Sequence, residues 1–112
     1  MSVNVDTNNG QALLAAIRAA IDSGRIQTWA YDSDGDFTHT ASQWNRRAWL
    51  RPSVSFGGLT FNILGPQGMG VSREIYGIYH GRFIEMLLVH FDRQFGTVQA
   101  TALATVGDAV TA

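Results

Sequence analysis

Residues 46–64 carry the pattern that most restricts the fold, because apolar and polar residues alternate there on both sides of a glycine pair. Alternation with a period of two is typical of a strand with one buried face. The buried face would hold Ala48, Leu50, Val54 and Phe56, and the other Arg47, Trp49, Arg51, Ser53 and Ser55. Gly57 and Gly58 suit a two-residue hairpin, and residues 59–64 continue as a second strand. Pro52 lacks a donor for the ladder, which favours an edge or interrupted strand.

Two segments have the spacing of helices. In residues 8–24, Leu13, Leu14, Ile17 and Ile21 fall on one face, and Gly24 suits the C-terminal stop. Asn8 and Gln11 have the spacing of a capping box. Residues 81–96 are too long for a typical strand and apolar almost all round, which predicts a helix buried on more than one side.

The remaining segments favour strands. Residues 25–32, 36–40, 71–81 and 97–106 are predicted strands, residues 41–45 a helical turn and residues 65–70 a loop. Residues 1–9 and about 106–112 are expected to be flexible. The chain is therefore expected to be one α+β domain over residues 1–112, in the order α-β-β-β-β-β-α-β. Its antiparallel sheet would have about four to six strands, mostly a meander, with two helices packed on one face.

Composition bears on partners and location. Charged residues make up 15% of the chain, against roughly 25% in a typical domain. A surface with so few charges favours burial against another chain, so a homodimer is expected. The net charge of −1 argues against nucleic acid as a partner. Neither a signal peptide nor an apolar run of membrane-spanning length is present, which favours a cytoplasmic protein without a membrane partner. The lysine-free, arginine-rich and alanine-rich composition suggests a bacterial source.

The acidic stretch YDSDGDFTH, residues 31–39, resembles the start of a calcium loop. Asp32, Asp34 and Asp36 supply its first three ligand positions. Phe37 stands where such a loop needs glycine, and Gln43 where it needs glutamate. Asp34-Gly35 is a favoured turn pair, so we predict a hairpin and no metal or other cofactor.

The stretch YHGRFIE suggests a second site. His80 would lie where a strand meets a helix, and the helix N-terminus there would favour an anion. Arg82 could add a charged fork, and His80 could exchange a proton. Alternatively, Arg82 pairs with Glu85 at the i, i+3 spacing. Glu85 could be a base if it were buried, but the polar stripe of the helix favours exposure.

The stretch RRAWLR, with the nearby Trp44, suggests a binding patch formed by Arg46, Arg47, Trp49 and Arg51. Arginine and tryptophan are enriched in protein interfaces, which is the preferred interpretation. A solvated sheet face is the second alternative, and nucleic acid the third.

No motif names a reaction, so a non-enzymatic role is preferred. We expect a small interaction or regulatory module that acts through protein–protein binding as a homodimer. The alternative is a protein that binds an anionic small molecule, or a small enzyme, with its site near His80 and Arg82. A further alternative is a weak nucleic-acid binder that uses residues 46–51.

Overall fold

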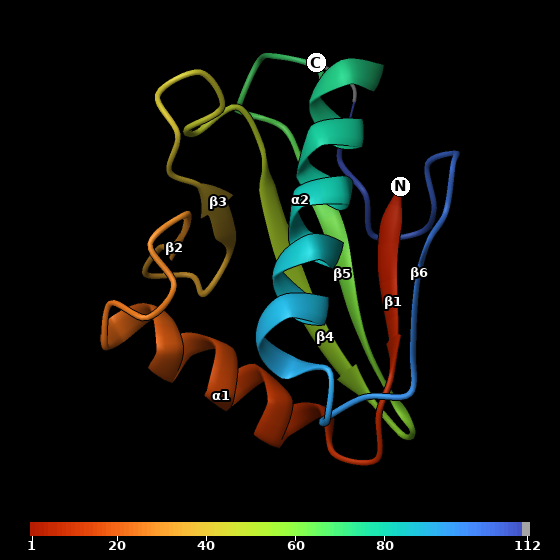
Figure 1. The fold of residues 1–112 in the computed structure, drawn as a ribbon. Helices are drawn as coiled ribbons and strands as arrows, with labels where there is room; N and C mark the ends of the chain where they lie inside the picture. The colour runs from red at the N-terminus through yellow and green to blue at the C-terminus, as the bar shows by residue number, and fades with distance from the viewer. Residues whose placement is uncertain (111–112) are drawn as a thin grey trace.

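The computed structural model describes residues 1–110. Two helices and six strands follow one another along this part of the chain (Figure 1). Their order is β1 (Ser2–Asp6), α1 (Gly10–Asp22), β2 (Trp29–Tyr31), β3 (Phe37–His39), β4 (Trp49–Ser55), β5 (Gly58–Leu64), α2 (Arg73–Phe91) and β6 (Thr97–Ala100).

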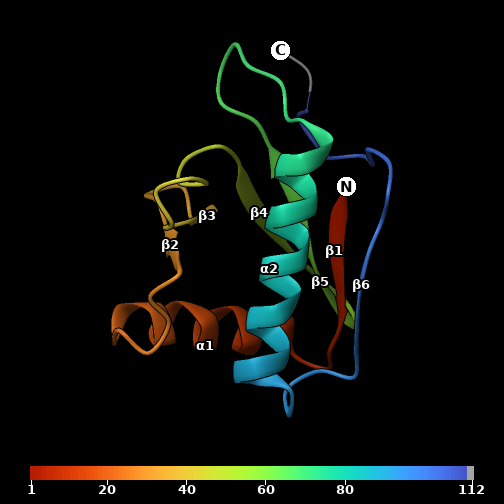
Figure 2. The ribbon, with the colours of Figure 1, turned by 45° about the horizontal axis from the view of Figure 1, so that its top comes forward.

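The strands form one antiparallel sheet in the order β2-β3-β4-β5-β1-β6. Strands β2 to β5 are a meander, and both helices contribute to a single core on one face of the sheet. Figure 2 shows α2 running along the strands and α1 crossing below them. The predicted α+β class, with a mostly meandering sheet and two helices on one face, is therefore confirmed.

The N-terminal segment differs from the prediction. Residues 2–6 are not irregular but form β1, which lies between β5 and β6 and buries Val3 and Val5. The alternation of Val3, Asn4 and Val5 is the only local signal for this strand, and its partners lie far away in the sequence. The order of elements therefore starts with a strand.

Helix α2 also corrects the prediction, because residues 73–81 belong to it and not to a strand. The sequence there is rich in isoleucine and tyrosine, which favour strands. The buried positions nevertheless have helical spacing across the whole segment: Ile75, Tyr79, Phe83, Met86 and Leu87. The Ser72 side chain caps the helix by accepting a hydrogen bond from the Ile75 amide.

The β4–β5 hairpin forms one residue earlier than predicted. Ser55 pairs with Gly58, so the two loop residues are Phe56 and Gly57, and Gly57 has a φ of 78°. Phe56 is consequently exposed at the tip instead of lying on the buried face. Pro52 is tolerated because β3 reaches β4 only at Leu50, which leaves one side of β4 unpaired from Pro52 onward.

Aromatic rings dominate the core. Phe83 on α2 contacts Phe61 on β5 and Trp29 on β2, with centroid distances of 4.5 and 5.0 Å. Phe37 on β3 lies 5.9 Å from the Phe83 ring. These edge-on and tilted contacts join the central helix to three strands, so they set the position of α2 against the sheet.

The C-terminal segment returns to the sheet, although the sequence predicts flexibility from about residue 106. Asp108 accepts hydrogen bonds from Asn62 and from the Ile63 amide, and Ala109 forms a bridge with Leu64. Residues 111 and 112 lie outside the described residues. No helix within residues 1–110 is long and apolar enough to span a membrane.

Candidate functional site

The strongest candidate site is a cavity between the start of β2, the end of β3 with the segment that follows it, and the C-terminal half of α2. Its volume is about 440 Å³. We call it the His39 cavity; it is lined by Thr28, Trp29, His39, Ala41, Gln43, Trp44, Arg82, Glu85, Met86, Val89 and His90. It therefore combines ionisable side chains with an aromatic and aliphatic wall, which is the composition of many ligand sites.

His39 is positioned by the end of β3. Its ring is nearly buried and lies edge-on against Trp29, with the centroids 5.1 Å apart. Its Nδ1 accepts a hydrogen bond from the Ala41 amide at 3.1 Å. Because Nδ1 is an acceptor in this bond, the proton of the neutral imidazole is on Nε2.

Arg82 and Glu85 reach the same cavity from α2. Both side chains are exposed, and Arg82 Nη1 lies 3.9 Å from Glu85 Oε1, so the predicted i, i+3 pair is present but loose. Burial lowers the pKa of His39, the charge of Arg82 lowers it further, and Glu85 opposes these effects. His39 is therefore a neutral donor and acceptor near pH 7, beside one cation and one anion.

The other polar residues of the cavity are Gln43 and His90. His90 is exposed in the last turn of α2, although it stands at helical spacing from the buried residues Phe83, Met86 and Leu87. Within residues 1–110, the only group of acids and histidines close enough to share a metal ion is Asp32, Asp34 and Asp36.

His80 is not part of this cavity. The sequence predicts it at a strand–helix junction, but it lies in the middle of α2, so no helix N-terminus faces it. Its Nδ1 bonds the Tyr76 carbonyl at 2.7 Å, and its ring is buried. Burial lowers the pKa of His80, while the backbone groups of Met1 and Tyr76 oppose this shift. The residues of the predicted site are therefore separated. Arg82 and Glu85 line the same cavity as His39, whereas His80 lines a different groove on α2.

The acidic loop is a hairpin, as its turn chemistry indicates. Asp32 Oδ1 accepts hydrogen bonds from the amides of Asp34 and Asp36 at 3.0 and 2.9 Å, and Gly35 has a φ of 83°. The Asp36 carboxylate accepts two hydrogen bonds from Arg51. The oxygens that would face a cation are therefore largely used within the fold.

The arginine–tryptophan stretch does not form one patch. Arg46 and Arg47 are exposed in the turn before β4, and only Trp49 and Arg51 belong to the strand. Arg51 is bound to Asp36, and Trp44 is packed against the core and lines the His39 cavity. These five residues therefore lie in three different environments.

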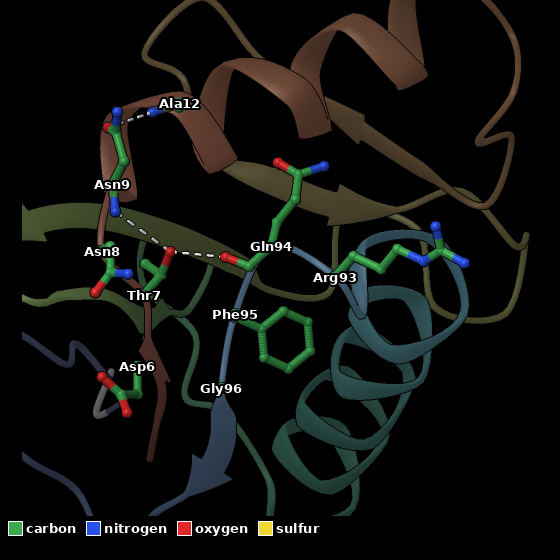
Figure 3. Close-up of a pocket in the computed structure, with 9 residues that line it drawn as sticks. All are labelled: Asp6, Thr7, Asn8, Asn9, Ala12, Arg93, Gln94, Phe95 and Gly96. Atoms are coloured by element: carbon green, nitrogen blue, oxygen red, sulfur yellow. Dashed lines mark hydrogen bonds between the residues drawn. The ribbon is translucent and has the colours of Figure 1, made fainter.

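A second hollow lies where the β1–α1 and α2–β6 connections meet (Figure 3). Two hydrogen bonds lie at its wall: the Thr7 hydroxyl donates to the Gln94 carbonyl at 2.8 Å, and Asn9 Oδ1 caps α1 by accepting from the Ala12 amide at 3.0 Å. The Thr7–Gln94 bond joins the two connections.

Sequence reasoning missed the central residue of the site. No second histidine stands at the spacing of a metal motif from His39. Arg82 and Glu85, its charged neighbours in the cavity, lie more than 40 residues away in the sequence. Its position opposite Trp29 in the predicted hairpin was the only available signal. Comparison with protein-family models, curated proteins and solved structures finds no match.

Proposed function

We propose that this protein binds a small organic anion in the His39 cavity. One observation carries the proposal: His39, Arg82 and Glu85 line one cavity of about 440 Å³, close enough for both charges to shift the pKa of the histidine. Cavities of roughly 300–1,000 Å³ with an apolar wall and a few convergent polar groups are typical of small-molecule sites.

Each part of the ligand has a complementary group. The Arg82 guanidinium is suited to a carboxylate or phosphate, which it can hold with two parallel hydrogen bonds. Trp44, Met86 and Val89 supply an apolar wall for the body of the molecule. Glu85 accepts a hydrogen bond from a donor group on the ligand, and His39 Nε2 donates one to an acceptor on the ligand.

A second candidate function is the interaction module expected from the composition. The exposed apolar side chains Leu88 and Val89 on α2 favour it more than the arginine–tryptophan stretch does. The nucleic-acid alternative has less support, since Arg51 is engaged by Asp36 and the net charge is −1. We propose a cytoplasmic location, which is the expectation from the sequence.

Calorimetric titration tests the ligand proposal with benzoate, the neutral benzamide and inorganic phosphate. Benzoate should bind most tightly, because it offers both a carboxylate and a ring. Arg82→Gln should weaken benzoate binding roughly 10- to 100-fold, since hydrogen bonds to charged groups contribute about 1.5–3 kcal/mol. Arg47→Gln is the matched control, because Arg47 is exposed outside the cavity. Equal losses in the two variants, binding of phosphate alone, or binding of none of the three would contradict the proposal.

A further inference from the structure

The outer face of α2 is open in the part of the chain that the structure describes. In Figures 1 and 2, α2 lies in front of the sheet, and no other element of residues 1–110 covers its outer side. Leu88 on this face is 51% exposed, and the adjacent Val89, which lines the His39 cavity, is 67% exposed. Exposed apolar side chains on the longest helix of a charge-poor chain favour contact with a partner.

One stripe of this face has a distinctive order of residues. The spacing of four, four, three, four and four residues keeps the stripe within about 100° of the helix surface. It consists of Arg73, Gly77, Gly81, Ile84, Leu88 and Asp92. Each half of the stripe therefore has one charged residue at the helix end and two uncharged residues towards the helix middle. The N-terminal half carries a cation and two glycines, and the C-terminal half an anion and two large aliphatic residues.

We propose that two copies of this chain pair through α2, with the helices antiparallel about a two-fold axis between Arg82 and Phe83. In this register Gly77 is level with Leu88 of the second copy, and Gly81 is level with its Ile84. Arg73 is level with its Asp92. Every contact occurs twice, as a two-fold interface requires.

The shape of the face suits this register. A Cβ atom built on Gly77 or Gly81 would have no atom of residues 1–110 within 4 Å, so the space above both glycines is open. Both glycines also border a mainly apolar groove of about 310 Å³ between α2 and residues 100–102. Large aliphatic side chains packed over glycines allow two helices to approach closely. Leu88 and Ile84 of the second copy would therefore occupy space that is empty in one chain.

The charges favour the antiparallel direction. Arg73 is the first residue of α2 and Asp92 is its C-cap, so each has the unfavourable sign for its own end of the helix dipole. An antiparallel partner places each charge beside a helix end of the opposite sign and beside the opposite charge. A parallel pair would instead bring Arg73 next to Arg73 and Asp92 next to Asp92.

Sedimentation equilibrium over a range of protein concentrations tests the pairing. The wild type should be a dimer, and Leu88→Arg should raise its dissociation constant at least about tenfold, as for a central interface residue. Phe56→Arg is the matched control, since Phe56 is fully exposed in the β4–β5 hairpin and does not belong to α2. A monomeric wild type, or a greater effect of Phe56→Arg than of Leu88→Arg, would overturn the proposal.

Two further sets of variants test the register. Arg73→Asp and Asp92→Arg should each weaken the dimer, and the double variant should restore it. Because the chain has no cysteine, a Gly77→Cys chain mixed with a Leu88→Cys chain should form a disulfide between the two. Preferential linkage of Gly77→Cys chains to each other would contradict the antiparallel direction. Neither set alters the His39 cavity, so these outcomes are independent of ligand binding.

Discussion

Arg51 on β4 holds the buried carboxylate of Asp36 with two hydrogen bonds, Nε to Oδ1 at 3.0 Å and Nη2 to Oδ2 at 2.7 Å. The Asp36 side chain is 5% exposed, whereas that of Arg51 is 55% exposed. This pair joins two features that look separate in the sequence, the acidic loop and the arginine–tryptophan stretch. The acidic loop and the arginine–tryptophan stretch therefore stabilise the fold by binding to each other.

Removing Arg51 should destabilise the protein. Arg51→Ala leaves the Asp36 carboxylate buried without its main donor, which costs about 1–3 kcal/mol. The lower part of this range is expected, because water reaches the exposed side of the pair. Urea denaturation measures the change, and Arg47→Ala serves as the control because Arg47 is exposed in a turn. Equal stability of the two variants would show that the pair contributes nothing.

The acidic loop should be structural. Asp32→Ala removes the acceptor for two backbone amides, so the free energy of unfolding should fall by about 1 kcal/mol. Ser33→Ala in the same loop should have a much smaller effect. Calcium at millimolar concentration should leave the thermal midpoint of the wild type unchanged, since the loop lacks the coordination of a calcium site. A midpoint that rises with micromolar calcium would refute this interpretation.

Stability should depend on pH in the range where histidine titrates. Burial lowers the pKa of both His39 and His80 below 6.5. Between the lowered value and 6.5 the unfolded chain binds more protons, so stability rises with pH and is complete above about 6.5. Urea midpoints from about pH 5 to pH 8 measure this slope, and His80→Gln should reduce it. A slope of opposite sign, or one that His80→Gln leaves unchanged, would argue against a buried neutral His80.

Two glycines should respond in opposite directions to alanine. Gly81 is exposed within α2 and has open space at its Cβ position, so Gly81→Ala should stabilise the monomer by up to about 1 kcal/mol. Gly24 follows α1 with a φ of 81°, a conformation that alanine adopts with strain. Gly24→Ala should therefore destabilise by about 1 kcal/mol. Denaturation at low protein concentration separates these effects from self-association.

Local patterns were sufficient for several elements. The face of Leu13, Leu14 and Ile17 and the stop at Gly24 predict α1, because they depend on spacings of three to four residues. Alternation around Leu50 and Phe61 likewise predicts the β4–β5 hairpin, where the paired strands adjoin in the chain. In both cases the residues that decide the structure are close neighbours in the sequence.

Other elements depended on distant partners. Strand β1 contains only Val3 and Val5 as buried alternating residues, and it becomes a strand because β5 and β6 supply its hydrogen bonds. The first turns of α2 contain strand-favouring residues, yet burial of Tyr79 beside Trp29 and of Phe83 against Phe61 continues the helix. Here the burial of side chains against the sheet outweighs intrinsic preference.

The sequence by itself determined the α+β class, the paired antiparallel strands and the exposed Arg82–Glu85 pair. Only the tertiary structure decided that this pair meets His39 while His80 faces the other side of α2. The physical reason is that helical and strand periodicities result from near neighbours, whereas a cavity results from the packing of distant segments. A single side chain such as His39 acquires its neutral state and its charged neighbours only when β3 and α2 come together.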